Sequence, residues 1–279
     1  VTITEENKAQ AQITIQNYFR MYPKLSGMTG TDKTQAQEIL QVYGMDVIQT
    51  PTNRKRMRRD NDDIVFLTPE AKYEYVAQEV LRRHENGQPV LVGTTSILQS
   101  EEVARYLKKY NLSFQLLNAK TVEQEVELIS EAGQKGRITV ATNMAGRGTD
   151  IVLGEGVAQL GGLFVIGTEK HESRRVDNQL RGRSGRQGDP GYSCFYLSAE
   201  DDLLKRFGSD RFKMIVNMAT GKEKDEEGNE LPLQMKVLSK FIESAQRKVE
   251  GYNFDNRKSV VEYDEVLRKQ REVIYKQRN

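Results

Sequence analysis

Short apolar runs alternate with amphipathic stretches between Gln88 and Leu197, and this alternation restricts the possible fold more than any other feature. The runs are rich in β-branched residues and too short for helices, whereas the stretches between them carry apolar residues at helical spacing. The expected strands are residues 90–94, 114–117, 138–142, 163–167 and 192–197, and the expected helices are 96–110, 122–132 and a polar one from about 172. Repeated strand–helix units predict an α/β fold whose parallel sheet is covered by helices on both faces.

The flanking sequences predict further elements. Upstream, helices are expected at residues 36–42 and 69–85, a strand at 64–67, extended chain at 47–49 and a break at Pro51. Downstream, residues 221–230 carry no apolar side chain and are expected to be flexible. From Leu233 to Asn279, two apolar stripes predict a helix of about 70 Å, with kinks expected at Gly251 and within 253–256. Such a helix would serve as a spine for other domains.

Composition excludes several classes of protein. Lys and Arg total 42 and Asp and Glu 40, a balance that gives no overall signal for nucleic-acid or membrane binding. No apolar run reaches the roughly 18 residues that cross a bilayer, and the polar N-terminus does not match a signal peptide. With one cysteine and two histidines, neither a disulfide nor a structural zinc site is expected, and Cys194 is predicted to lie in the core. Because the sequence starts at Val1 and ends within a helical pattern, we expect a piece of a longer chain.

One basic cluster interrupts this balance. It consists of Arg54, Lys55, Arg56, Arg58 and Arg59. A solvated linker and a contact surface for a polyanion or a partner explain it equally well.

The first motif, residues 141–151 (ATNMAGRGTDI), begins at the end of the strand expected at 138–142, where open α/β sheets bind ligands. The glycines beside Arg147 let the backbone approach a ligand closely, and Arg147 can bind a phosphate through two N–H groups. Asp150 can accept hydrogen bonds from ribose hydroxyls or hold an arginine in place. A tight loop closed by an internal arginine–aspartate pair explains the same residues equally well.

The second motif, residues 179–190 (QLRGRSGRQGDP), interleaves Arg181, Arg183 and Arg186 with glycines. Each glycine costs a helix about 1 kcal/mol relative to alanine, so their repetition favours close backbone approach over a solvated basic face. Arg183 and Arg186 are three residues apart and would share one face of a helical turn. Arginines of this kind can stabilise the charge that develops during phosphoryl transfer. A basic surface loop is the weaker alternative.

Residues 27–34 (GMTGTDKT) nearly match a P-loop, but Asp32 replaces its second glycine. A carboxylate there would face the phosphates and block the approach of the backbone, so we reject a P-loop. The acidic residues 200–202 fit the first turn of a helix better than a Walker B carboxylate. The sequence thus carries the arginines of an NTPase without its phosphate loop, which fits the second of two RecA-like domains that bind a nucleotide between them.

Taken together, these motifs resemble those of the SecA family, the ATPase motors of bacterial protein export. The resemblance covers nearly the whole chain and includes long consecutive strings. The matching stretches are residues 18–22, 27–31, 51–54, 87–94, 117–120, 141–154, 161–178, 179–191, 195–197, 245–250, 253–255 and 262–264.

The resemblance implies three parts: the end of a first nucleotide-binding domain (residues 1–50), a second, RecA-like one (51–218) and the start of a long scaffold helix (219–279). It implies an ATP-driven motor that pushes preproteins through the SecY channel, located in the cytoplasm and at the inner face of the cell membrane. Expected partners are the first nucleotide-binding domain, the SecY complex, preproteins and anionic lipids, but not nucleic acid. The isolated chain is expected to be inactive, because the Walker residues and the ligands of Mg²⁺ would lie outside it.

The resemblance also implies roles for single residues. The nucleotide ATP would be contacted by Asp150, Arg147, Gly148 and Gln179. Arg183 and Arg186 would act on the phosphates during catalysis, together with Arg147 as a sensor, and Arg186 would be the arginine finger. Residues 27–31 would couple the two nucleotide-binding domains, and no metal ligand is implied within the chain.

The sequence departs from the family's pattern at two places. The loop after Gly154 is short, and Leu231-Pro232-Leu233 replaces a His-Pro-Trp found in many relatives. These departures leave open an accessory SecA of restricted substrate range.

The main alternative function is the second domain of a superfamily 2 nucleic-acid helicase, whose last two motifs are built similarly. A non-enzymatic regulatory module is the other alternative. The long C-terminal helix favours the translocase.

Overall fold

The computed structural model of the protein describes residues 12–117, 125–142, 148–208, 210–220, 232–233 and 236–278. The chain divides into two compact units. The smaller combines Val1–Gln49 with Glu250–Asn279, and the larger runs from Thr50 to Val249. The segment expected to be flexible, residues 221–230, lies outside the described residues, so that prediction stays open.

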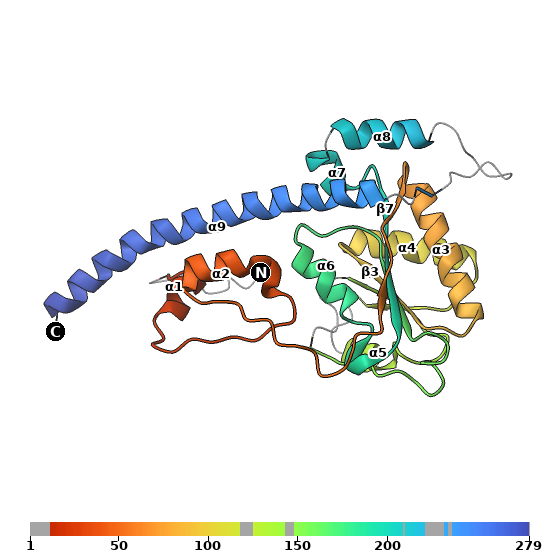
Figure 1. The fold of residues 1–279 in the computed structure, drawn as a ribbon, viewed down its shortest axis with the longest axis horizontal. Helices are drawn as coiled ribbons and strands as arrows, with labels where there is room; N and C mark the ends of the chain where they lie inside the picture. The colour runs from red at the N-terminus through yellow and green to blue at the C-terminus, as the bar shows by residue number, and fades with distance from the viewer. Residues whose placement is uncertain are drawn as a thin grey trace, which may run out of the picture. The chain divides into compact units, whose positions relative to one another are not determined.

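A seven-stranded sheet forms the core of the larger unit (Figure 1). Its strands are β1 (Arg59–Asp60), β2 (Ile64–Phe66), β3 (Val90–Thr94), β4 (Gln115–Leu117), β5 (Ile138–Thr142), β6 (Leu163–Gly167) and β7 (Gly191–Ser198). They follow the order β1-β7-β6-β3-β5-β4, β2 also pairs with β7, and each pairing between these strands is parallel. Every strand expected from the alternating pattern is present. β1 was not predicted, because two residues carry no readable periodicity.

Successive side chains of a strand point to opposite faces of the sheet, and helices cover both faces. Val90 and Val92 of β3 join one hydrophobic cluster with α3 (Pro69–Glu85) and α4 (Ile97–Lys109). Leu91, between them, joins the other cluster with α5 (Glu125–Glu131) and α6 (Arg174–Arg181). Figure 1 shows α3 and α6 on opposite sides of the sheet. The predicted class, a RecA-like parallel sheet with helices on both faces, is confirmed.

Side-chain caps explain where the main helices of this unit begin. Thr68, Ser96 and Ser173 stand directly before α3, α4 and α6, and each accepts a hydrogen bond from a backbone N–H of the first turn. Such caps satisfy donors that have no partner within the helix. Each of these helices therefore starts close to its predicted position.

Two further helices, α7 (Asp202–Phe207) and α8 (Asp210–Thr220), follow β7. The acidic residues 200–202 thus lie at the start of a helix, as their sequence indicated. Asp201 turns inward and accepts a hydrogen bond of 2.6 Å from Lys72 Nζ on α3. Both side chains are almost fully buried, which makes this the deepest charged contact among the described ion pairs.

The C-terminal helix α9 runs from Lys236 to Arg278, 43 residues and therefore about 65 Å. Its first turns belong to the larger unit, where Leu238 and Ile242 are fully buried. The helix continues without interruption through Gly251 and residues 253–256, where kinks were expected. A Cβ at Gly251 would meet no atom within 4 Å, so this glycine does not mark a close contact.

In the smaller unit, α1 (Ile15–Arg20), a 3₁₀ turn (Asp32–Gln35) and α2 (Ala36–Tyr43) lie with the second part of α9. Asp264 on α9 accepts hydrogen bonds from Thr14 N (3.0 Å), Thr14 Oγ1 (2.7 Å) and Asn17 Nδ2 (2.8 Å). Arg257 donates to both carboxylate oxygens of Glu38 at 2.7 Å. Polar contacts therefore define this unit.

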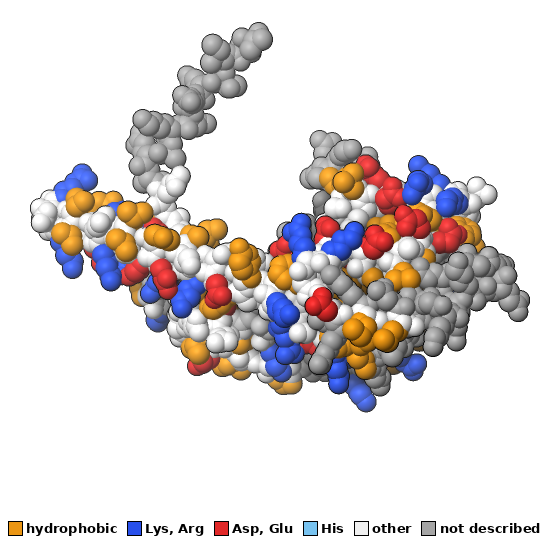
Figure 2. All heavy atoms as spheres, turned by 90° about the horizontal axis from the view of Figure 1, so that it is seen from above, with side chains coloured by type: hydrophobic (Ala, Val, Ile, Leu, Met, Phe, Trp, Pro, Cys, Tyr) orange, Lys and Arg blue, Asp and Glu red, His pale blue; other side chains and the backbone are white. Residues whose placement is uncertain are grey.

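The second part of α9 also exposes hydrophobic side chains between its charged ones (Figure 2). They belong to Tyr252, Val260, Tyr263, Val266, Leu267, Val273, Ile274 and Tyr275. Among the described helices, none has the length and apolar character that crossing a membrane requires.

Candidate functional site

The first motif is described in part. Residues 143–147, and with them Arg147, lie outside the described residues. Gly148 follows with a positive φ of 93°, a conformation that favours glycine. Ile151 is buried in the cluster beneath α5 and α6, and this anchors the chain directly after Asp150. Asp150 itself is exposed, so its carboxylate is held near the surface by a buried neighbour.

The second motif starts on α6, which carries Gln179, and continues into the arginine loop, which we define as residues 182–188. The helix ends at Arg181, and Gly182 follows as its C-terminal cap. Gly185 and Gln187 then adopt positive φ values of 71° and 52°. The interpretation that Arg183 and Arg186 share one face of a helical turn is therefore wrong, because Gly185, which lies between them, adopts a left-handed conformation.

The two arginines nevertheless meet the first motif. Arg183 Nη1 donates to the carbonyl oxygen of Thr149 (3.3 Å), and Arg186 Nη1 donates to Asp150 Oδ1 (2.5 Å). Arg186 Nε also donates to the carbonyl oxygen of Gly182 (3.1 Å). Asp150 thus pairs with an arginine of the second motif, so the two arginine–glycine segments form one site.

This site lies at the amino ends of the strands. Ser184 Oγ donates to the carbonyl oxygen of Leu163, the first residue of β6 (2.7 Å). Val152, two residues after Asp150, packs closely against Gly133, which precedes β5: a Cβ on Gly133 would lie 2.1 Å from the carbonyl oxygen of Val152. The sequence rule for open α/β sheets pointed to the carboxyl ends instead. The segment that follows Asp150 and the arginine loop lie instead near the residues that begin or precede β6 and β5.

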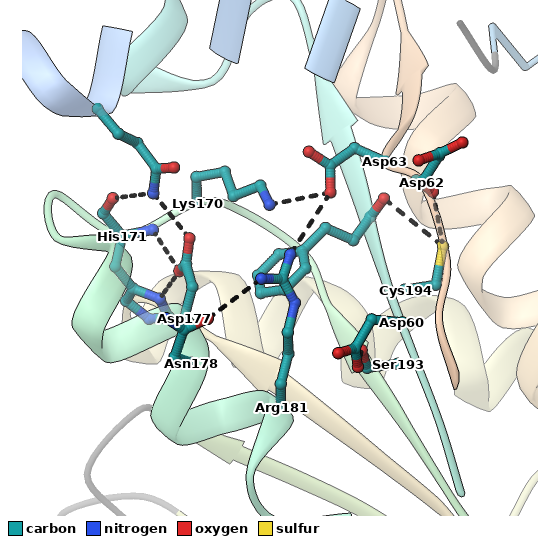
Figure 3. Close-up of polar contacts among 12 residues, drawn as sticks. Asp60, Asp62, Asp63, Lys170, His171, Asp177, Asn178, Arg181, Ser193 and Cys194 are labelled. Atoms are coloured by element: carbon teal, nitrogen blue, oxygen red, sulfur yellow. Dashed lines mark hydrogen bonds and ion pairs between the residues drawn. The ribbon is translucent and has the colours of Figure 1, made fainter. Parts of the chain in front are cut away.

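Buried polar contacts hold α6 at both ends (Figure 3). At its start, Asp177 accepts hydrogen bonds from the backbone N–H of His171 (3.0 Å) and from Gln246 Nε2 on α9 (2.7 Å). At its end, Arg181 Nη2 lies 4.0 Å from Asp63 Oδ1, which also pairs with Lys170 Nζ at 2.9 Å. These contacts fix the direction in which α6 delivers the arginine loop. Sequence analysis did not predict them, because Gln246 and Asp63 are far from their α6 partners in the chain.

The basic segment, residues 54–60, also reaches this site. Arg58 donates to the carbonyl oxygens of Arg181 and Ser184, and Arg54 donates to that of Gln187. From the sequence alone, a solvated linker and a contact surface explained this cluster equally well. The structure shows that two of its arginines contact the backbone of the arginine loop.

Cys194 and the element before residues 27–34 agree with their sequence interpretation. Cys194 is buried on β7, and burial raises the pKa of its thiol to about 12, so the thiol stays protonated. Helix α1, rather than a strand, precedes residues 27–34, which agrees with the rejection of a P-loop there. In the part of the chain that the structure describes, no three His, Cys, Asp or Glu side chains are arranged to hold a metal ion.

Family models match almost the entire chain. The SecA P-loop domain matches residues 55–159 and 155–224, the SecA Wing and Scaffold domain matches 232–279, and the SecA DEAD-like domain matches 1–40.

Curated relatives match over nearly the full length of this chain. The protein translocase subunit SecA of Halothermothrix orenii is 55% identical over 278 residues, covering 100% of this chain and 32% of the relative. That of Thermotoga neapolitana is 58% identical over 279 residues, covering 100% and 31%. The protein translocase subunit SecA 2 of Geobacillus thermodenitrificans is 58% identical, covering 99% and 34%. The chain thus spans about a third of the length of these relatives.

Solved structures are more distant. The yeast DEAD-box splicing factor Prp28 has a TM-score of 0.46 at 16% identity, covering 76% of this chain and 44% of that one. The E. coli DEAD-box protein SrmB has a TM-score of 0.40 at 20% identity, covering 55% and 83%.

Proposed function

The chain belongs to the SecA family, and from this premise we propose that it forms part of an ATP-driven motor that moves preproteins through the SecY channel across the bacterial cytoplasmic membrane. Within that motor, the larger unit contributes one wall of a nucleotide site between two nucleotide-binding domains. The observation that carries this proposal is the convergence of Asp150, Arg183 and Arg186 in one exposed site. Because the family models span nearly the whole chain, we set aside the nucleic-acid helicase as an alternative.

The three predicted parts of the chain follow the same proposal. Residues 1–50 are the end of the first nucleotide-binding domain, 51–218 the second one and 219–279 the start of the scaffold helix. Support comes from the family models, whose matches end at residue 40, run from 55 to 224 and resume at 232. The Walker residues belong to the missing part of the first domain, so the isolated chain does not hydrolyse ATP.

The chemistry of the site fits a phosphate. About a third of the Arg186 side chain is exposed (35%), and the side chain of its partner Asp150 is more exposed still (59%). An ion pair in water contributes only about 0–1 kcal/mol, so exchanging the carboxylate for a phosphate oxygen costs little. A phosphate also offers the planar fork of arginine two oxygens at once. Asp150 therefore keeps Arg186 in place until a nucleotide arrives.

Each residue then has a role in the proposed site. Arg186 is the arginine finger and Arg183 a second phosphate contact, while Asp150 also contacts the nucleotide. The remaining nucleotide contacts are Arg147, Gly148 and Gln179. Mg²⁺ accompanies ATP and neutralises phosphate charge, and its ligands come from outside this chain.

Partners and location follow from the family proposal. The motor docks on the SecY complex and on anionic lipids at the inner face of the cytoplasmic membrane, and it takes preproteins as substrates. Relatives named SecA and SecA 2 are equally similar to this chain, at 58% identity.

The test is Arg186→Ala in the full-length protein. A finger acts on the transition state, so kcat for ATP should fall about 10³-fold or more while the dissociation constant for ATP changes little. Arg105→Ala is the matched control, because Arg105 is an exposed arginine of the same unit that pairs with its helix neighbour Glu102. Equal losses of turnover and affinity, or an unchanged kcat, would contradict the proposed role.

A further inference from the structure

The basic segment holds the arginine loop by its backbone. Arg58 Nη1 donates to the carbonyl oxygens of Arg181 (2.8 Å) and Ser184 (3.1 Å). Arg54 Nη1 donates to the carbonyl oxygen of Gln187 (3.3 Å). The segment therefore contacts this backbone at three places: before Gly182, between Gly182 and Gly185, and between Gly185 and Gly188. At each place an arginine cation donates to a carbonyl oxygen.

Arg58 is itself anchored to the sheet. Its Nε and Nη2 donate to the two carboxylate oxygens of Asp60 at 2.7 and 3.1 Å, and its side chain is only 12% exposed. Asp60 also accepts a hydrogen bond from Ser193 Oγ on β7 (2.7 Å), and Figure 3 shows these two residues side by side. Partial burial raises the pKa of Asp60, but the hydrogen bonds from Arg58 and Ser193 outweigh this effect, so the pKa lies below its ordinary value. The guanidinium is thus a fixed group.

The glycines of the loop permit this contact. Gly185 has a φ of 71°, and a Cβ there would lie 2.5 Å from Arg58 Cβ. Gly188 has a φ of 85°, and its Cβ would lie 3.0 Å from Arg54 Cβ. The sequence interpretation assigned these glycines to close approach of a ligand. The structure shows that they also make room for the basic segment.

The contact bears directly on Arg186. Arg181 is the last residue of α6, and carbonyls at a helix end lack partners and carry partial negative charge. Arg58 donates to the carbonyl oxygen of Arg181, which also accepts from the backbone N–H of Ser184 (3.1 Å), and to the carbonyl oxygen of Ser184. Gly182 lies between these two residues, and its carbonyl oxygen accepts from Arg186 Nε. The orientation of the Arg186 guanidinium is therefore set by backbone that Arg58 holds.

We propose that Arg58 is a positioning residue for Arg186, fixing the arginine loop so that the finger meets the transferred phosphate. This rests on the proposed function of the site. Displacing a group by about 1 Å can cost up to a hundredfold in rate. Arg58 acts through the loop, so its loss lowers turnover and leaves the binding of ATP intact.

The experiment uses the full-length protein with Arg58→Ala, Arg186→Ala and the double variant. For Arg58→Ala, kcat should fall roughly ten- to hundredfold with less than about a twofold change in KM for ATP. In the Arg186→Ala background, Arg58→Ala should change kcat by less than about twofold, since the finger it positions is gone. Lys55→Ala, an exposed cation of the same segment, is the control and should leave kcat unchanged.

A second measurement reads the loop directly. Amide hydrogen exchange in residues 182–188 of the nucleotide-free protein should accelerate in Arg58→Ala but not in Lys55→Ala. Arg58→Lys guards against a variant that fails to fold, because it keeps the charge and the apolar stem. One ammonium cannot serve two carbonyls and both oxygens of Asp60, so Arg58→Lys should recover only part of kcat.

Two results would overturn the inference. One is unchanged kcat and loop exchange in both Arg58 variants, and the other is an equal fall of kcat with and without Arg186. Failure of the proposed function looks different: Arg186→Ala itself would then leave kcat unchanged, whereas loop exchange would still respond to Arg58.

Discussion

Two ion pairs of the larger unit have nearly the same length and opposite surroundings. Lys72 Nζ lies 2.6 Å from Asp201 Oδ1, and the two side chains are 1% and 5% exposed. Arg186 Nη1 lies 2.5 Å from Asp150 Oδ1, with 35% and 59% exposed. Distance alone does not separate them. Their environments do, and the environment decides whether a pair supports the fold or can be opened by a ligand.

The buried pair has no alternative to its partner. Lys72 links α3 to the turn between β7 and α7, where Asp201 also accepts from the backbone N–H of Ser198 at 2.8 Å. Separating these charges would leave one of them in an apolar environment, at a cost of several kcal/mol. The exposed pair can exchange its carboxylate for water or an anion at a cost below about 1 kcal/mol. A charged ligand is therefore expected at the second pair.

The largest effect that tests this comparison is the loss of Lys72. Lys72→Ala should lower the free energy of unfolding of this chain by about 3–5 kcal/mol, because Asp201 stays buried without its partner. Urea unfolding followed by circular dichroism measures this loss, and the matched variant Arg186→Ala should change it by less than about 1 kcal/mol. The combination of Lys72→Met with Asp201→Asn should recover most of the stability, since neither charge then remains. Similar losses for Lys72→Ala and Arg186→Ala would break the comparison.

An intermediate effect is expected at Asp264, a carboxylate held by hydrogen bonds. Bonds from Thr14 Oγ1, Thr14 N and Asn17 lower its pKa from 3.8 to about 2. A carboxyl group with a lowered pKa in the folded state stabilises the fold above its unfolded pKa, and that stabilisation disappears as pH falls. The smaller unit should therefore lose stability between about pH 4 and pH 2.

The measurement for Asp264 is acid unfolding followed by circular dichroism. Asp264→Asn should be less stable at neutral pH and should lose less additional stability in this window. Glu262→Gln is the control, because Glu262 is exposed on the same helix and pairs loosely with Lys258 at 3.8 Å. Parallel pH profiles for the wild type and Asp264→Asn would contradict the expected role of these hydrogen bonds.

The smallest effect concerns the exposed pair itself. A double-mutant cycle with Arg186→Ala and Asp150→Ala should give a coupling free energy below about 1 kcal/mol, since water already screens both charges. This coupling should shrink further in about 1 M salt, where screening acts over roughly 3 Å. The effect of Lys72→Ala should not respond to salt. A large, salt-resistant coupling between Arg186 and Asp150 would make their pair structural and weaken the proposed exchange for phosphate.

Much of the fold could be predicted from sequence because its signals are local. The alternation between Gln88 and Leu197 placed β3, β5 and β6 at their observed residues, and Thr68, Ser96 and Ser173 mark the helix starts. Two local predictions failed. Glycine at residue 251 does not interrupt α9, since the neighbouring helical residues outweigh a cost of about 1 kcal/mol. The turn that would align Arg183 and Arg186 is absent, because Gly185 adopts a left-handed conformation.

The sequence by itself determined the parallel sheet, the arginine–glycine character of both motifs and the absence of a P-loop signature at residues 27–34. These depend on residue type and on spacing over a few positions. The tertiary structure alone decided that Asp150 pairs with Arg186, 36 residues away, and that Arg58 caps carbonyls 123 and 126 residues away. It also placed the arginine loop near the amino ends of the strands. Such pairings depend on the order of strands and on where the chain crosses the sheet, and no local pattern of side chains encodes that order.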